Sequence, residues 1–288
     1  VIGLERVDRA FSRYETLVFP EDHPSAQFNL MYIERIIKFL LWQRGAWKVY
    51  VGGPEELGKQ IRAIYSPSGM RKFDYEFMGR IYGHDFEVVV CAADEVPPAS
   101  ELQKSLGRHL DGQRIGFDLG ASDLKVSAVV DGEAIFSTEI EWQPTKSNDP
   151  EYHRIEIQNA LDLAKNKLNH LDAIGGSSAG VYVNNRPMVA SLYRGIPTSE
   201  YHKVHDLFLN IRDEMGVPLE IVNDGEVTAL AGSMSLEDNA VLGIAMGSSE
   251  AAGYVTPEGN ITDWLNELAF APVDYAPGAP EDEWSGDK

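Results

Sequence analysis

The sequence predicts an α/β protein. Short apolar runs rich in β-branched residues, such as 47–51 and 114–120, alternate with segments in which apolar residues recur every three or four positions. The chain has 288 residues, 43% hydrophobic and 24% charged, so it can bury the core of one large or two ordinary domains. No uncharged run approaches the ~20 residues that a membrane span needs. We therefore expect a soluble protein without a membrane segment.

Charge and cysteine content narrow the class of protein further. Residues 1–110 hold 14 Lys and Arg against 15 Asp and Glu, whereas residues 111–288 hold 11 against 30, and no Lys or Arg lies between Arg212 and Lys288. A surface this acidic repels polyanions, so we expect no nucleic-acid or membrane partner. Cys91 is the single cysteine, and no secretory signal is visible. Both observations favour the cytoplasm.

The first hundred residues predict a separate α/β unit. Leu30, Ile33, Ile37 and Leu40 recur at helical spacing. "WKVYV" (47–51) and "FEVVVCA" (86–92) are typical of strands, and Pro54 after a glycine pair is typical of a helix start. The glycine pair resembles an anion site, but the two glutamates after Pro54 favour a plain turn. "DEVPPAS" (94–100) predicts a linker.

From residue 113 the order of predicted elements becomes informative. "RIGFDLG", "LKVSAVV" and "EAIFSTEI" predict three strands, the last two joined by an Asp131-Gly132 hairpin turn. A helix with apolar residues from Ile157 to Leu171 follows, then a strand in "DAIGGSSAG". A second helix from about Ser199, the strand "LEIV" and a helix in "NDGEVTALAG" complete the series.

This β-β-β-α-β-α-β order is that of a half-domain of the actin-like, ribonuclease-H-like fold. "VLGIAMGSSEAAGY" (241–254) would then begin a second half with strand, turn and strand. In open α/β sheets, ligands bind at the carboxyl ends of the strands. We predict a first lobe at 111–222 and the start of a second lobe at 223–288, after an accessory unit at 1–110.

Four segments of small and polar residues follow strands in this region: "GFDLGASDLKVSAVVDGE", "IGGSSAG", "IVNDGEVTALAG" and "MGSSEAAGYV". In this order they resemble the ROK family of sugar kinases in the actin-like ATPase superfamily. The resemblance runs from about Arg114 to Asp274. It implies ATP and Mg²⁺ as cofactors and a sugar or sugar-like alcohol as substrate.

The first segment resembles the family's first phosphate motif, an Asp-x-Gly-Gly-Thr turn. By that resemblance Asp118 would help to hold Mg²⁺, and the amides of Gly120, Ala121 and Ser122 would face the phosphates. Ala121 stands where the family has its second glycine, and Ser122 where it has threonine. The alternative is a hairpin with an ordinary surface aspartate, although a carboxylate in an apolar strand needs a partner or a metal.

The second and third segments resemble the parts of the family that face the sugar. Gly180 would lie in the loop beside it, although a plain small-residue loop is equally compatible. Asp224 matches the general base that takes a proton from the acceptor hydroxyl, and Asn223 matches the residue that binds a neighbouring hydroxyl. The alternative is that either residue merely caps the following helix. Glu226 replaces the family's second asparagine.

The fourth segment resembles the family's second phosphate turn, Gly-Thr-Gly-x-Gly-Gly-Gly. Gly247, Ser248 and Ser249 would bring main-chain amides and a hydroxyl close to a phosphate. Glu250 is unfavourable there unless it points away or binds through Mg²⁺. A plain hairpin is the alternative.

Downstream, Glu267 matches the glutamate of the family's Gly-Glu-x-Gly-His sugar segment, and Phe270 stands where the family has histidine. No cysteine-rich loop follows, so we expect no structural zinc. His202 and His205, three apart on a predicted helix, have no further ligand nearby in the sequence. The family's adenosine-binding segment is not recognisable, so we expect either further residues beyond Lys288 or loss of the nucleotide site.

These patterns favour a sugar kinase that uses Mg²⁺-ATP, with Asp224 as base and Asn223 and Glu267 orienting the acceptor. The alternative is a non-catalytic carbohydrate- or nucleotide-binding regulator of the same fold. A DNA-binding repressor is disfavoured because residues 1–110 contain no dense basic helix. A purely structural interaction protein is a third class, and a homodimer is a candidate assembly.

Overall fold

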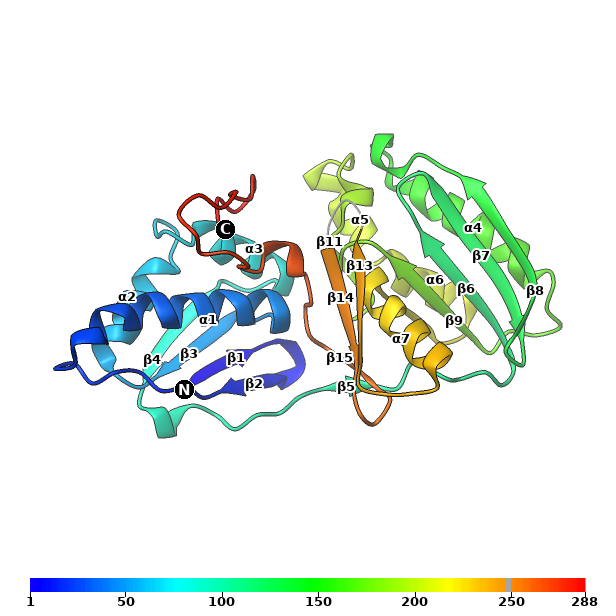
Figure 1. Ribbon diagram of the computed structural model, residues 1–288. Helices are drawn as coiled ribbons and strands as arrows, with labels where there is room; N and C mark the ends of the chain where they lie inside the picture. Colours follow the sequence, from blue (N-terminus) through cyan, green and yellow to red (C-terminus); the bar gives the residue numbers. More distant parts are fainter. Residues whose placement is uncertain (247–249, 288) are drawn as a thin grey trace. The chain divides into compact units, whose positions relative to one another are not determined.

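Residues 1–246 and 250–287 are described by the computed structural model (Figure 1), and they divide into two units. The first unit comprises the described residues of Val1–Lys104, Met246–Ala252 and Ile261–Lys288. The second comprises Ser105–Ala245 and Gly253–Asn260. The predicted lobe boundaries at 111 and 223 stay predictions.

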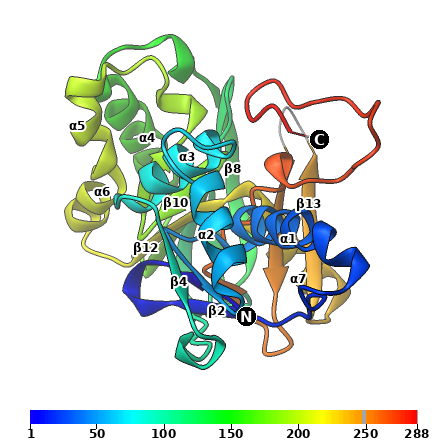
Figure 2. The same cartoon turned by 90° about the vertical axis from the view of Figure 1, so that its left-hand side faces the viewer.

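The first unit is built on a four-stranded sheet with the order β2-β1-β3-β4. Its strands are β1 (Ile2–Glu5), β2 (Phe11–Tyr14), β3 (Lys48–Gly52) and β4 (Glu87–Cys91). Its helices are α1 (Asn29–Arg44), α2 (Glu55–Ile64) and α3 (Lys72–Tyr82). β1 is antiparallel to both of its neighbours, and β3 is parallel to β4. Figure 2 shows α1 and α2 beside each other.

The predicted helix at 30–41 and the predicted strands at 47–51 and 86–92 are present as α1, β3 and β4. The helix predicted to start at Pro54 is present as α2, which begins one residue later at Glu55. β1, β2 and α3 were not predicted. The two strands have four residues each, which is too short to show a clear alternation of apolar and polar residues. Two charged residues of α1 are buried, although the sequence suggests that they face water. Glu34 accepts a hydrogen bond from Arg71 Nε at 2.5 Å, and Lys38 Nζ lies 3.0 Å from Asp74 Oδ1.

The second unit is built on a five-stranded sheet with the order β12-β9-β6-β7-β8. Its strands are β6 (Gln113–Leu119), β7 (Asp123–Val130), β8 (Glu133–Glu141), β9 (Ala173–Ser178) and β12 (Leu219–Asn223). β6, β7 and β8 form an antiparallel meander, and β9 is parallel to both β6 and β12. This is the strand order of a ribonuclease-H-like half-domain, so the predicted fold class is confirmed.

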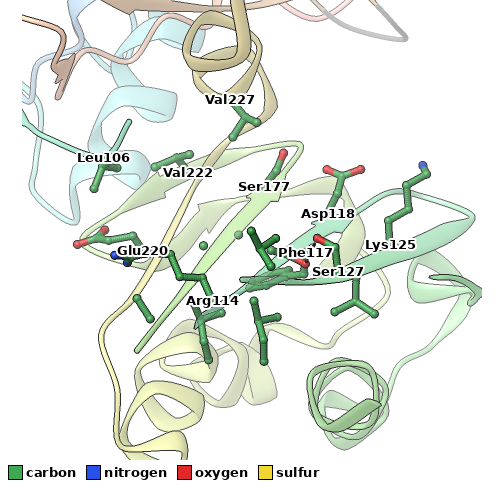
Figure 3. Close-up of a pocket in the computed structure, with 18 of the residues that line it drawn as sticks. Leu106, Arg114, Phe117, Asp118, Lys125, Ser127, Ser177, Glu220, Val222 and Val227 are labelled. Atoms are coloured by element: carbon green, nitrogen blue, oxygen red, sulfur yellow. Dashed lines mark hydrogen bonds between the residues drawn. The ribbon is translucent and has the colours of Figure 1, made fainter. Parts of the chain in front are cut away.

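Helices lie on both faces of this sheet. They are α4 (Pro150–Lys165), α5 (Tyr201–His205), α6 (Leu207–Met215) and α7 (Asp224–Leu236). Alternate β6 residues Ile115, Phe117 and Leu119 enter the main core with apolar residues of α4, α5 and α6. α7 contacts β9 and β12 and lies over the opposite face (Figure 3).

Two predicted helices have different bounds in the structure. The helix expected to run to Leu171 ends at Lys165, and Leu168 packs on the core from the loop that follows. It begins at Pro150, where Asp149 caps it by accepting a hydrogen bond from the Glu151 amide. The helix expected from Ser199 is divided at Asp206 into α5 and α6.

A hairpin of β10 (Val181–Val183) and β11 (Arg186–Val189) was not expected. Its turn residue Asn185 reaches the edge strand β12, where its side chain accepts from the Ile221 amide at 2.8 Å and donates to the Leu219 carbonyl at 3.1 Å. The Asn185 side chain therefore forms hydrogen bonds with two backbone groups on the outer edge of β12, where no neighbouring strand of the sheet pairs with them.

The remaining strands are β5 (Gln103–Lys104), β13 (Val241–Met246), β14 (Glu250–Val255) and β15 (Ile261–Thr262), in the order β13-β14-β15-β5. The strands predicted on either side of residues 247–249 are present as β13 and β14. In the described part of the chain, none of the helices combines the length and the apolarity that crossing a bilayer requires.

Candidate functional site

The strands of the second unit bring three predicted site segments to one edge of the sheet. β6, β9 and β12 run parallel, and their carboxyl ends lie at Leu119, Ser178 and Asn223. Asp118 is in register with Ser177 of β9 on one side and with Lys125 of β7 on the other. Residues paired across adjacent strands project to the same face, and Figure 3 shows these three side chains on the side of α7.

Asp224 is the first residue of α7, directly after β12. Burial raises the pKa of its carboxyl group, and the negative charge of Asp118 raises it further, while hydrogen bonds from its own amide and that of Gly225 oppose the shift. The two carboxylates therefore act on each other electrostatically. The sheet brings Asp118 and Asp224 to the same edge although 105 residues lie between them.

Asn223 caps α7, as the alternative interpretation of the sequence suggested. Its Oδ1 accepts from the Gly225 amide at 2.7 Å, and its backbone amide donates to Glu226 Oε2 at 3.2 Å. Its Nδ2 donates to the Gly180 carbonyl at 2.8 Å. Both polar ends of the Asn223 side chain are thus bound within the protein.

Gly180 adopts a φ of +121°, a conformation that favours glycine. A Cβ atom there would lie 2.7 Å from the Ala190 side chain, so the loop after β9 packs closely on the end of the β10–β11 hairpin. The bond from Asn223 joins this loop to the start of α7. The second and third predicted segments are consequently neighbours.

The turn between β6 and β7 holds Gly120, Ala121 and Ser122. The Gly120 amide donates to the Asp123 carbonyl at 2.9 Å, and Trp142 Nε1 donates to the Gly120 carbonyl at 2.8 Å. Among the described residues, the amides of Ala121 and Ser122 have no hydrogen-bond partner. Two donors of this turn are therefore available for an anion, whereas the Gly120 amide is used by the turn.

Lys125 is a site residue that the sequence reading missed. Its Nζ lies 3.0 Å from Asp123 Oδ1, and this hydrogen bond is the main reason why its pKa is raised, with the charge of Asp118 among the smaller causes. The signal was present in the hairpin, since Asp118 and Lys125 become direct partners once the β6–β7 register is drawn. Lys125 supplies a positive charge in a strongly acidic half of the chain.

A cavity of about 640 Å³ lies on the same face of the sheet (Figure 3). Asp118, Lys125 and Ser177 line the end near the carboxyl termini of the strands, and Arg114 and Glu220 line the far part. Most of its wall is apolar, and Val227 of α7 closes one side. Asp224 does not line the cavity, so only the end at Asp118 belongs to the candidate site.

The second predicted phosphate turn, Gly247, Ser248 and Ser249, lies outside the described residues. Two glycines of the strands that flank it have a packing role. A Cβ at Gly253 would lie 2.4 Å from the Gly225 carbonyl oxygen, and a Cβ at Gly243 would lie 2.4 Å from the Ala229 amide nitrogen. The absence of side chains thus lets these strands approach the backbone of α7.

Glu267 belongs to the first unit and stands before a 3₁₀ turn, Leu268–Phe270. Phe270 packs on Trp42 at 4.6 Å and on Phe73 at 5.2 Å between ring centroids. The aromatic residue that replaces the family's histidine is therefore part of a hydrophobic cluster.

The residues near Asp118 fit a magnesium ion of the kind that accompanies a nucleotide. Mg²⁺ in such sites is held by one or two carboxylates together with phosphate oxygens, and Asp118 and Asp224 are two carboxylates that repel each other. Across residues 1–246 and 250–287, no three His, Cys, Asp or Glu side chains gather as a metal-binding group. His202 and His205 are accordingly not part of such a group.

No protein-family model and no curated protein matches the chain. Among solved structures, it is similar to a ROK hexokinase from Thermus thermophilus, with 15% identity and a TM-score of 0.46 over 59% of this chain and 56% of that chain. It is similar to a ROK family transcriptional regulator, a homolog of the E. coli MLC protein, with 19% identity and a TM-score of 0.49 over 68% of this chain and 48% of that chain.

A third similar structure is an inorganic polyphosphate/ATP-glucomannokinase from Arthrobacter sp. strain KM, with 17% identity and a TM-score of 0.42 over 57% of this chain and 65% of that chain. The chain spans about half the length of the first two structures, 56% and 48%. The resemblance to ROK proteins predicted from the four segments is thus also found among solved structures. The fold assignment itself rests on the strand order of the second unit.

Proposed function

We propose that the chain is an ATP-dependent phosphotransferase whose acceptor is a hydroxyl group of a sugar or a sugar-like alcohol. The observation that carries this proposal is that the parallel strands β6, β9 and β12 bring Asp118 and Asp224 to the same edge of the sheet. Phosphoryl transfer needs a metal-binding carboxylate and a second carboxylate near the acceptor, held in fixed positions.

Asp224 is the proposed general base. Its place at the first residue of α7 fixes its backbone, and its raised pKa brings the carboxylate closer to the basicity that proton transfer from an alcohol requires. The acceptor oxygen would form a bond to the terminal phosphorus of ATP as the bond to the diphosphate leaving group breaks. The hydroxyl proton would pass to Asp224.

The phosphate side is proposed to lie at the β6–β7 turn. The amides of Ala121 and Ser122 would donate to phosphate oxygens, and Lys125 would add a positive charge. Asp118 would hold Mg²⁺, which would neutralise part of the phosphate charge when bound. Gly120, Gly247, Ser248 and Ser249 remain assigned to the phosphates through the family resemblance.

The acceptor side is proposed to lie at the loop that contains Gly180, with Asn223 behind it. Both ends of the Asn223 side chain form hydrogen bonds within the protein. We therefore propose that Asn223 mainly positions Asp224 and Gly180. Glu267 is retained as a substrate-binding residue on the resemblance alone.

The test is phosphoryl transfer from Mg²⁺-ATP to a panel of hexoses and N-acetylhexosamines. We expect Asp224→Asn to lower kcat by about 10²-fold or more, the usual contribution of a general base. Lys125→Met should mainly raise the KM for ATP. Glu214→Gln, which removes an exposed carboxylate on α6, is the matched control and should leave both constants unchanged. Full activity of Asp224→Asn on a sugar that the unmodified chain phosphorylates would remove the assigned base.

A non-catalytic regulator of the same fold is the second candidate. It is favoured by the engagement of Asn223, since a side chain that caps α7 and binds Gly180 is held in place and keeps only one N–H and one oxygen lone pair for a sugar hydroxyl. Calorimetric titrations with ATP and with the sugar panel separate the two functions. Sugar binding without nucleotide affinity would support the regulator.

A further inference from the structure

The first unit contains a buried group of three cations that the proposed function does not use. Arg35, Lys38 and Arg71 come together from α1 and the segment before α3. Lys38 is fully buried, the Arg71 side chain is 5% exposed, and the Arg35 side chain is 26% exposed. Arg35 is therefore the member that a molecule from solution can reach.

Two carboxylates of the same body bind these cations. Glu34 pairs with Arg71 at 2.5 Å and with Arg35 at 3.4 Å, and Asp74 pairs with Lys38 at 3.0 Å. Three positive and two negative charges leave one excess positive charge in a poorly solvated place. Such a charge is costly unless an anion compensates it.

The third carboxylate comes from the far end of the chain. Asp287 places both carboxylate oxygens 2.7 Å from Arg35 Nη1, and lies 2.8 Å from Arg71 Nη1 and 3.6 Å from Lys38 Nζ. The segment that delivers it contains a local turn in which the Asp282 carboxylate accepts from the amides of Trp284 and Ser285. An aspartate side chain from the segment 281–287 thus fills an anion site of the folded body.

A cavity of about 770 Å³ adjoins this anion site. Arg35 and Tyr275 line it, and the Arg35 guanidinium lies 5.2 Å from the centre of the Tyr275 ring. Much of the remaining wall is aromatic, and several of these residues are about half exposed: Phe19, Phe28, Tyr32 and Phe39. None of the described residues that line it is Asp or Glu. The cavity accordingly combines an apolar body with a cationic end.

We infer that this cavity binds a small carboxylate with an apolar, aromatic body, whose head group takes the place of the Asp287 carboxylate at Arg35. Aromatic walls favour a flat apolar ligand, and the positive charge that Asp287 leaves uncompensated when it withdraws favours an anionic head. Asp287 is the internal competitor of this ligand. Its segment is released when the ligand binds, so that occupancy of the cavity is coupled to the position of residues 281–287.

The first experiment uses the unmodified chain and two probes that differ only in the head group, phenylbutyrate and phenylbutanol. We expect saturable calorimetric binding of phenylbutyrate and none of phenylbutanol over the same concentration range. Hydrogen exchange of residues 281–287 should become faster with phenylbutyrate. Equal binding of the two probes, or unchanged exchange in that segment, would contradict the inference.

The second experiment uses variants. Asp287→Asn removes the competing charge and should strengthen phenylbutyrate binding by about tenfold, whereas Arg35→Met should abolish it. Glu283→Gln, in the same segment, is the matched control and should bind as the unmodified chain does. Unchanged affinity of Asp287→Asn would overturn the competition. If light scattering shows a homodimer and phenylbutyrate does not bind to it, the inference is overturned and this surface is assigned to a second copy of the chain. Both experiments are independent of kinase activity.

Discussion

At the scale of single residues, Asp224 shows how a local position acquires chemical meaning. It directly follows a strand and begins a helix, a place where aspartate is commonly a cap. Here the cap is Asn223, so Asp224 is left with a carboxylate that is partly withdrawn from water and exposed to the charge of Asp118. The sequence predicted the pair Asn223-Asp224, and the structure assigns the two residues different local tasks.

The raised pKa of Asp224 predicts a pH-dependent effect on stability. The native state holds the proton more tightly than the unfolded state, whose carboxyl has the ordinary value of 3.8. The stabilisation from this proton is complete below 3.8 and is lost as the pH rises through the higher native pKa. At neutral pH, Asp224→Asn should therefore unfold at a slightly higher temperature than the unmodified chain.

The gain should be small, because the carboxylate is partly exposed and solvent screens it. Thermal unfolding followed by circular dichroism between pH 3 and pH 8 measures it, with Glu214→Gln as the exposed carboxylate control. If Asp224→Asn is less stable than the unmodified chain at neutral pH, the interactions of the Asp224 carboxylate stabilise the fold by more than the burial of its charge destabilises it.

At the scale of elements, the small residues around "MGSSEAAGY" have two separable explanations. The phosphate interpretation concerns Gly247, Ser248 and Ser249. Gly243 and Gly253 instead have a packing reason, because each lies against the backbone of α7 where no Cβ fits. A glycine-rich pattern therefore does not by itself distinguish ligand contact from close packing of a strand on a helix.

Gly253→Ala tests this packing. The added Cβ would meet Glu226 Cα and the Gly225 carbonyl oxygen at 2.4 Å, and backbone atoms cannot move aside cheaply. We expect a loss of about 1 to 3 kcal/mol in the free energy of unfolding, measured by urea denaturation. Gly175→Ala in β9 is the control, since a Cβ there has no neighbour within 4 Å. Equal stability of the two variants would refute the close approach of β14 to α7.

At the scale of the whole molecule, the charge distribution limits the kind of partner. The chain carries a net charge of −20, and Lys125 is one of few cations near the candidate site.

We expect no binding of a fluorescein-labelled random DNA duplex at low salt. Ionic screening is weakest at low salt. Repulsion between the acidic half and the phosphate backbone is therefore strongest in that condition, and so is attraction by any basic surface. Fluorescence anisotropy measures DNA binding at 50 mM and at 200 mM salt. Binding that weakens between these two concentrations would reveal a basic surface and would favour a regulator.

The sequence by itself determined the order of the strands and helices in the second unit, and with it the ribonuclease-H-like topology, because apolar periodicity and turn residues act over short distances. It also indicated Asp118, Asn223 and Asp224 as candidate site residues. Only the tertiary structure decided that Asp118 and Lys125 face one cavity, that Asn223 is occupied by its cap, and that Glu34, Lys38 and Asp287 are buried. These outcomes depend on strand register and on partners far away in the chain, which hydrophobic patterns along one segment do not encode.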